Sequence, residues 1–262
     1  MEIPIYQVDA FTGRPFGGNA AAVCPLTHWP EDRLMQRIAE ENNLAETAFF
    51  VRDGTGFRLR WFTPEIEMDL CGHATLAAAH VLFKHLGHPG DTIHFTSMSG
   101  PLTVRKKDGR IELDFPARDP VPARLPPIIA AGIGAEPLEV LKARDYVLLL
   151  RDEAAVRSLE PDRQLLDRIN IDPGGIIVTA RGSRTDFVSR FFTPQAAIFE
   201  DPVTGSAHCS LVPYWAKKLG KTVMVAEQVS RRSGTLWCEL AGDRVRMAGE
   251  AVTYMEGKIR LS

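Results

Sequence analysis

The chain has 262 residues, of which 45% are hydrophobic and 24% charged, an ordinary globular composition that excludes a disordered chain. The 31 Lys and Arg residues nearly balance the 33 Asp and Glu residues, which argues against nucleic-acid binding through bulk electrostatics. Apolar runs such as residues 147–150 are far shorter than the roughly 18 residues of a membrane helix. We therefore expect neither a nucleic acid nor a membrane as a partner.

The beginning of the chain and its cysteines both indicate a cytoplasmic protein. The first residues lack the basic region and the apolar stretch of a secretory signal. Four cysteines lie far apart and form no CxxC pair, as is usual in a reducing compartment: Cys24, Cys71, Cys209 and Cys238.

Short runs rich in Val, Ile, Phe and Thr, separated by Gly and Pro, predict many strands. Helical patterns are fewer, at residues 31–41 and 161–169, and the five prolines of residues 116–127 suggest a linker. Asp108-Gly109 and Gly242-Asp243 are typical of hairpin turns. The predicted strands cover residues 5–11, 47–51, 57–62, 92–96, 102–106, 111–115, 146–150, 176–179, 187–192, 223–229, 236–240 and 245–248.

Three blocks of the first half recur in the second half, in the same order and at nearly constant spacing. RWFTP at 60–64 recurs as RFFTP at 190–194, and SGPL at 99–102 recurs as SGTL at 233–236. Between them, the 16-residue block 72–87 recurs as 205–220, with Gly at both ends of each copy. This repetition predicts a duplicated α+β domain.

The repeated 16-residue blocks predict one central helix in each domain. Residues 72–87 are apolar on nearly all sides, which is typical of a buried helix, and the surrounding strands would form a curved, mostly antiparallel or mixed sheet around it. Gly87 and Gly220 stand where a helix-terminating glycine is expected. We predict domains at 1–117 and 118–262, with the last strand, about 251–262, free to pack back on the N-terminal domain.

The starts of both central helices offer backbone N–H groups with little side-chain cover, at Gly72 and Gly205. Such groups bind anions, most simply a carboxylate, and two of these helix starts facing each other would form one site.

Cysteine and histidine pairs raise two further possibilities. Cys71-x-His73 and His208-Cys209 lack the ligand spacing of a structural zinc site, so we expect no metal. Cys71 precedes a helix start, where a thiolate would be stabilised, so a racemase using Cys71 stays an alternative. The repeat places Thr204, not a second cysteine, at the equivalent position, which disfavours two-thiol chemistry, and Cys209 is expected to be packed inside its helix.

Four motifs together resemble the PhzF-like (phenazine-biosynthesis) family: FGGN at 16–19, NLAETAF at 43–49, CGHAT at 71–75 and EDPVTGSA at 200–207. The resemblance extends from Tyr6 to about the end of the chain. It implies the diaminopimelate epimerase-like fold, a site in the cleft between two similar domains, and often a homodimer. It also implies an isomerase without a cofactor, acting on a small carboxylate-bearing molecule. In the best-known member, a Glu of the AET block moves a proton on a dihydro-hydroxyanthranilate.

By this resemblance the catalytic residues are Glu46, His73 and Asp201. The residues implied in substrate binding are Asn19, Gly72, Gly205 and Ser206. The family usually has Pro where this chain has Ala20, which puts the rigidity of the FGGN loop in question.

From the residues alone, each role has a plainer alternative. Glu46 could be a surface residue at a strand start, and His73 a packing residue whose ring the helix dipole keeps neutral. Asp201 could complement the dipole of the second helix, and Ser206 could cap it. The sequence thus favours an isomerase with Glu46 as acid and base. A racemase or epimerase using Cys71 and a non-catalytic binder of small acids remain the alternatives.

Overall fold

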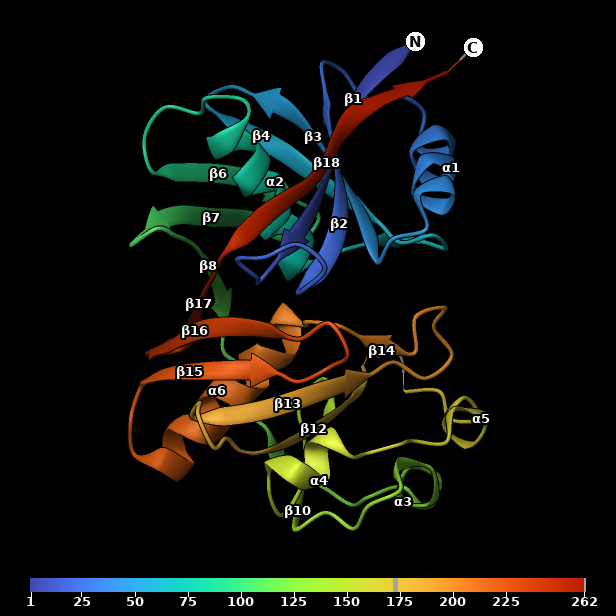
Figure 1. Ribbon diagram of the computed structural model, residues 1–262, viewed down its shortest axis with the longest axis vertical. Helices are drawn as coiled ribbons and strands as arrows, with labels where there is room; N and C mark the ends of the chain where they lie inside the picture. Colours follow the sequence, from blue (N-terminus) through green and yellow to red (C-terminus); the bar gives the residue numbers. More distant parts are fainter. Residues whose placement is uncertain (172–173, 262) are drawn as a thin grey trace. The chain divides into compact units, whose positions relative to one another are not determined.

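Two buried helices, α2 (Gly72–Lys84) and α6 (Gly205–Leu219), each belong to a separate part of the chain and pack on their own strands (Figure 1). The computed structural model describes residues 1–171 and 174–261. Unit 1 comprises Met1–Asp114 and Met247–Ser262, and unit 2 comprises Phe115–Arg246. The predicted fold class, α+β with two duplicated sheet-and-helix domains, is confirmed.

The strands of unit 1 pair in the order β18, β1, β2, β3, β4, β6, β7 and β8. The β2–β3 and β4–β6 pairs are parallel and the others antiparallel, so the sheet is mixed. Helix α2 packs against β1, β2, β3 and β18. The strands are β1 (Glu2–Ala10), β2 (Asn19–Leu26), β3 (Glu46–Asp53), β4 (Gly56–Phe62), β5 (Glu67–Met68), β6 (Thr92–Ser97), β7 (Gly100–Lys107), β8 (Arg110–Pro116) and β18 (Ala251–Arg260).

Helix α1 (Asp32–Asn42) covers the face of this sheet opposite α2. Its buried residues Met35 and Ile38 form one apolar cluster with Ala22 and Phe49 of the strands. Because side chains alternate along a strand, the neighbours of Ala22 and Phe49 face α2 instead. This alternation decides which strand residues reach the start of α2.

In unit 2 the pairing order is β9, β10, β11, β12, β13, β15 and β16, with parallel pairs β11–β12 and β13–β15. Helix α6 packs on β15 and β16, and an apolar core joins the short helices to β11, β12 and β13. The elements are β9 (Val121–Pro122), α3 (Pro127–Ile133), β10 (Glu139–Lys142), β11 (Tyr146–Leu149), α4 (Glu153–Arg157), α5 (Arg163–Leu166), β12 (Ile176–Arg181), β13 (Phe187–Phe192), β14 (Glu200–Asp201), β15 (Val223–Gln228) and β16 (Gly234–Ala241). Strand β17 (Arg244–Gly249) begins in unit 2 and ends in unit 1.

The predicted turns and helix ends are largely confirmed. Asp108 and Gly109 both have positive φ and join β7 to β8 as a two-residue hairpin, and Gly242 has φ 66° between β16 and β17. Gly220 ends α6 in the left-handed conformation. Helix α2 ends earlier than predicted, at Lys84, but Gly87 has φ 62° and the His88 N–H donates to the Leu82 carbonyl, which closes the turn.

Both central helices are buried, as their composition predicts, along Gly72–Leu82 and along most of α6. Pro213 lies inside α6 and cannot donate to the Cys209 carbonyl. The Arg118 N–H donates to that carbonyl instead, at 2.9 Å. Arg118 is part of the proline-rich segment predicted as a linker, so this segment is held against α6 within unit 2.

The repeated sequence blocks make repeated contacts. Arg60 forms two parallel hydrogen bonds with the Glu67 carboxylate, both 2.7 Å, and Arg190 does the same with Glu200 at 2.7 and 2.9 Å. Such bidentate pairs fix the relative direction of the two strands that carry them. In each unit this pair therefore places the short strand that leads to the central helix.

The structure also contains elements that the sequence did not indicate. Helix α3 begins at Pro127 and ends before the left-handed Gly134, and α4 is capped by the Asp152 side chain. The division of the chain falls after Asp114 and after Arg246, whereas the prediction placed one boundary after residue 117. Strand β18 pairs with β1 from Ala251 to Arg260; Ser262 lies outside the described residues.

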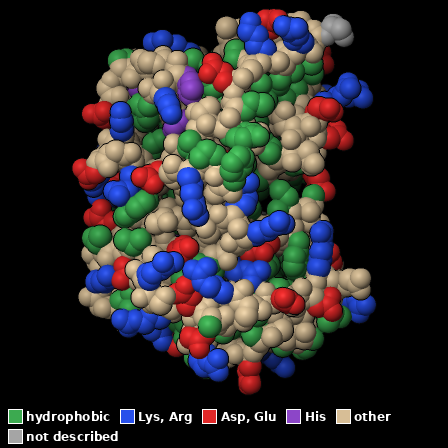
Figure 2. All heavy atoms as spheres, in the orientation of Figure 1, with side chains coloured by type: hydrophobic (Ala, Val, Ile, Leu, Met, Phe, Trp, Pro, Cys, Tyr) green, Lys and Arg blue, Asp and Glu red, His purple; other side chains and the backbone are tan. Residues whose placement is uncertain are grey.

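The longest described helix, α6, has 15 residues, and no described helix has the length and apolarity to cross a membrane. Acidic and basic side chains are interspersed over the face shown in Figure 2, in keeping with the balanced charge of the sequence.

Candidate active site

The start of α2 meets two polar side chains that the strands of unit 1 direct toward it. Asn19 and Glu46 are the first residues of β2 and β3. Because Ala22 and Phe49 face α1, alternation places Asn19 and Glu46 on the α2 side of the sheet. His73, the second residue of α2, lies between them.

The imidazole of His73 touches a different partner through each of its nitrogens. Nε2 lies 3.0 Å from Oε2 of Glu46, and Nδ1 lies 3.1 Å from the side-chain amide of Asn19. The side chains of His73 and Glu46 are only 5% and 15% exposed. Within the described residues neither Nε2 nor Oε2 has a hydrogen-bond partner with good geometry. The polar group that each atom approaches is therefore the other one, at 3.0 Å.

Asn19 is suited to either protonation state of the ring. Its N–H group can donate to an unprotonated Nδ1, and its oxygen can accept from a protonated Nδ1. The side chain of Asn19 is 1% exposed. The structure therefore places Asn19 behind His73, as a partner of the ring.

The charge state of His73 differs from the expectation based on the helix dipole. Burial of the ring opposes the imidazolium, whereas the Glu46 carboxylate 3.0 Å away favours it, and the pKa of His73 is raised well above its ordinary value. The expectation of a neutral ring considered only the helix start and missed a carboxylate at 3.0 Å. The favoured state is an imidazolium paired with Glu46.

Cys71 is the N-cap residue of α2, with its Sγ 3.5 Å from Nδ1 of His73. Burial, together with the nearby Glu46 carboxylate, raises the pKa of the Cys71 thiol to about 11. The expectation that the helix start would stabilise a thiolate is therefore wrong, and Cys71 is a neutral thiol near pH 7. Cys209 is buried inside α6 as predicted, and burial raises the pKa of its thiol to about 12.

Glu46, Cys71 and His73 offer three potential metal ligands within 4.8 Å of one another. The thiol approaches Nδ1 of the ring, however, and the carboxylate approaches Nε2. Because a single imidazole nitrogen binds a given metal, an ion held by all three groups would have to replace one of these two contacts. This arrangement suits proton transfer through the ring better than metal coordination.

The first turn of α2 leaves its backbone donors available. Cys71 has an extended conformation, and its side chain makes no capping bond to the described first turn. The Thr75 hydroxyl donates to the Cys71 carbonyl, which fixes the chain entering the helix. The N–H groups of Gly72 and His73 belong to the same helical turn as the His73 side chain that contacts Glu46, and a carboxylate ligand could accept from them.

The remaining predicted residues lie at the start of α6 in unit 2. Thr204 is the N-cap residue, and its hydroxyl donates to Oδ2 of Asp201. Ser206 is the second helical residue rather than the cap, so the expectation that it caps α6 is wrong. Gly205 is buried and Ser206 is partly exposed. Asp201, Gly205 and Ser206 therefore form one local group, held by Thr204, a residue that the prediction considered only as the counterpart of Cys71.

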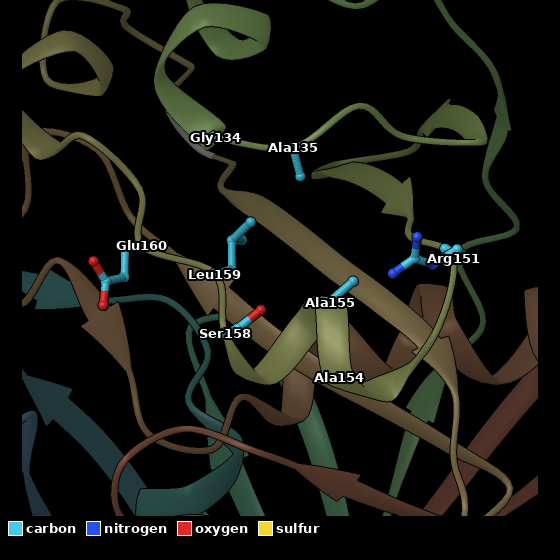
Figure 3. Close-up of a pocket in the computed structure, with 8 residues that line it drawn as sticks. All are labelled: Gly134, Ala135, Arg151, Ala154, Ala155, Ser158, Leu159 and Glu160. Atoms are coloured by element: carbon cyan, nitrogen blue, oxygen red, sulfur yellow. The ribbon is translucent and has the colours of Figure 1, made fainter.

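A cavity of about 430 Å³ lies elsewhere in unit 2, between the end of α3 and helix α4 (Figure 3). Most of its lining residues are small, and its two charged residues, Arg151 and Glu160, lie at opposite ends (Figure 3). None of the predicted site residues lines this cavity. Because polar groups do not converge on it, we assign it no catalytic role.

Two sheet-wrapped helices with a buried carboxylate and imidazole at the start of one define a diaminopimelate epimerase-like α+β protein. The chain belongs to the phenazine biosynthesis-like family, because the PhzC-PhzF family model matches residues 8–257. An uncharacterised isomerase of Pseudomonas aeruginosa is 52% identical, over all of both chains.

Solved structures agree with this assignment. A PhzF family protein from Enterococcus faecalis has a TM-score of 0.96 at 48% identity, covering all of both chains. A hydroxyproline epimerase from Agrobacterium vitis has a TM-score of 0.62 at 10% identity, over 98% of this chain and 92% of its own, and shows likeness of fold alone.

Proposed function

We propose that this protein is a cofactor-independent isomerase in which Glu46 moves a proton on a small carboxylate-bearing substrate. The observation that carries the proposal is the buried contact between Glu46 Oε2 and His73 Nε2, 3.0 Å apart at the start of α2. A carboxylate positioned in a largely desolvated place is suited to general acid–base work. Relatives named as isomerases support the reaction class.

In the proposed reaction, Glu46 removes a proton from a substrate carbon and the electron pair of the broken C–H bond enters the π system of the substrate. Glu46 then returns the proton to a different carbon, so the product is an isomer and no proton is consumed. His73, as an imidazolium, holds Glu46 in place and offsets negative charge that develops on the substrate. Asn19 keeps the ring in position through Nδ1.

Substrate binding is assigned to the helix starts. The donors proposed in unit 1 are the N–H groups of Gly72 and His73 in the first turn of α2, and those proposed in unit 2 are the N–H groups of Gly205 and Ser206 in the first turn of α6. Asp201 orients a polar group of the ligand through a carboxylate that Thr204 fixes. The contact of Asn19 with His73 favours a positioning role for Asn19 over the direct substrate contact that the family resemblance implies.

One observation favours a second candidate, an epimerase that uses Cys71. The thiol lies 3.5 Å from Nδ1 of His73, a distance at which the ring could take its proton. The raised pKa of Cys71 opposes this role, since a thiolate is the reactive form. A non-catalytic binder of small acids has no need for a buried acid–base pair, and the pair therefore argues against it.

The test follows deuterium wash-in from heavy water, with a dihydro-hydroxyanthranilate as the probe and protein dialysed against a chelator. Glu46→Gln keeps the shape of the side chain but loses the base, so exchange should fall about 10²–10⁴-fold. Cys71→Ala should keep most of the wild-type rate. Glu112→Gln is the matched control, because Glu112 is another buried acid of unit 1. Exchange that survives in Glu46→Gln but is lost in Cys71→Ala would favour the thiol.

A further inference from the structure

A buried glutamine holds the segment that carries Asp201. Gln228 is the last residue of β15 and is fully buried. It pairs with Ser189 of β13, while Asp201 pairs with Phe191 two residues further along the same strand. The sheet therefore brings the side chain of Gln228 to the end of β14, where the chain turns into α6.

Both the oxygen and the nitrogen of the Gln228 side-chain amide form hydrogen bonds with the segment 201–204. Oε1 accepts from the Thr204 N–H at 2.9 Å, and Nε2 donates to the Asp201 carbonyl at 2.7 Å. Nε2 also donates to the Thr204 hydroxyl at 3.2 Å, and that hydroxyl in turn donates to the Asp201 carboxylate. One side chain thus fixes the backbone on both sides of the segment and the hydroxyl that orients the Asp201 carboxylate.

Comparison of the two repeated units shows whether the fold itself requires the contacts of Gln228. In unit 1 the Ser99 hydroxyl donates to the Asp69 carbonyl, and in unit 2 the Ser230 hydroxyl donates to the equivalent Pro202 carbonyl. The strand position of Gln228 corresponds to Ser97, which bonds instead to the carbonyl of its own hairpin partner Gly100. A serine hydroxyl thus reaches the corresponding carbonyl in both units, although Ser230 lies three residues before Ser233, the counterpart of Ser99 in the repeated block. The glutamine contact, in contrast, belongs to the unit that carries Asp201.

We propose that Gln228 is a positioning residue that sets the Asp201 carboxylate and the first N–H groups of α6 for the substrate. This inference rests on the proposed function for its catalytic part. A buried amide is well suited to the role, because it is uncharged and presents an acceptor and a donor from one rigid plane.

Three variants test the proposal. Gln228→Met keeps the length of the side chain and removes all three hydrogen bonds. Gln228→Glu keeps an acceptor for Thr204 but lacks the donor toward Asp201 unless its carboxyl is protonated. Gln36→Met is the matched control, because Gln36 donates to the Thr63 carbonyl in unit 1, outside the candidate site.

The first readout is hydrogen exchange of the Thr204 backbone amide, followed by NMR. We expect the Thr204 amide to exchange at least about tenfold faster in Gln228→Met than in the wild type, because the variant lacks the oxygen that accepts from this amide. In Gln36→Met the exchange rate of Thr204 should not change. Unchanged protection of Thr204 in Gln228→Met would overturn the proposal. This readout needs no substrate, so it decides the positioning claim even if the wild type fails to act on the probe and the proposed function fails with it.

The second readout is turnover of a dihydro-hydroxyanthranilate as a function of pH. Gln228→Met should lower kcat at least about tenfold. The variant should still unfold in urea in a single cooperative transition, as the wild type does. The activity of Gln228→Glu relative to the wild type should rise as pH falls, because a protonated carboxyl can again donate to the Asp201 carbonyl. Wild-type kcat in Gln228→Met, or a pH-independent ratio for Gln228→Glu, would contradict the proposal.

Discussion

His208 should make the protein lose stability in acid by an amount that the structure defines. Its ring is fully buried in α6, stacks at a tilt against Phe187 with 5.9 Å between centroids, and contacts the Thr204 carbonyl through Nδ1 at 2.8 Å. Burial lowers the pKa of His208 to about 4, although the Thr204 carbonyl acts in the opposite direction. The neutral ring therefore donates from Nδ1 at pH 7.

The sign of the effect follows from proton binding. Between pH 6.5 and pH 4 the unfolded chain protonates this histidine while the folded protein does not, so stability falls as pH falls. Each pKa unit corresponds to about 1.4 kcal/mol, and the shift from 6.5 to about 4 gives a loss of roughly 3 kcal/mol between pH 7 and pH 4. That amount is a large fraction of the stability of an ordinary domain.

The assay compares urea unfolding of the wild type and of His208→Asn at several pH values. Asparagine can place its N–H near the position of Nδ1, so it can keep the bond to Thr204, but it does not titrate. The variant should be less stable at pH 7, since it leaves part of the ring volume empty. The difference in free energy of unfolding between the wild type and His208→Asn should decrease by about 3 kcal/mol from pH 7 to pH 4.

The fluorescence of Trp215 reports on this unit, because its ring stacks on Phe187 and its Nε1 donates to Thr179. The exposed residue His28 provides the control, and the His28→Asn variant is unfolded in urea at the same pH values. If the free energy of unfolding of His208→Asn and that of the wild type depended on pH in the same way, the assignment of a buried neutral ring would be refuted.

Three further predictions concern the candidate site and the assembly. Asp201→Asn should weaken binding of the probe and lower kcat, each by about tenfold or more, whereas Glu46→Gln should leave binding nearly unchanged; equilibrium dialysis and initial rates measure the two. Asn19→Ala should reduce the free energy of unfolding by about 1–3 kcal/mol, as it leaves the buried Nδ1 of His73 without its amide partner, and urea titration checks this. The family resemblance implies a homodimer, so light scattering should give twice the chain mass of 29.0 kDa, and a mass of one chain would contradict this expectation.

Much of the fold could be predicted because its determinants are local. Alternating strands, the turn at Asp108-Gly109 and the glycine that ends α6 each depend on a few neighbouring residues. The repeated sequence blocks predicted that the fold contains two similar domains. Helix α3 was missed although its signals were present, a proline at its start and Gly134 at its end, because its seven residues read as one more apolar run after a proline-rich segment.

The site was less accessible from sequence, because its contacts join distant parts of the chain. The family resemblance indicated Glu46 and His73, but nothing local predicts that they touch, nor that Asn19 supports the ring from 54 positions away. The charge of His73 and the pKa of Cys71 were misjudged because only the helix dipole was considered. Burial is the main cause that raises the pKa of Cys71, and the nearby Glu46 carboxylate favours a charged His73 ring. Gln228 had no sequence signal, as its partners lie 24 and 27 residues earlier.

The central claim is that a protonated His73 ring is paired with the Glu46 carboxylate at the start of α2. Nitrogen-15 NMR of the imidazole rings tests it most directly, in the wild type and in Glu46→Gln, without any substrate. The account predicts that His73 in the wild type is protonated on both nitrogens at pH 7 and that the Nε2–H signal shifts when Glu46 is replaced. A His73 ring that is neutral at pH 7, or an Nε2 signal that Glu46→Gln leaves unchanged, would contradict the account.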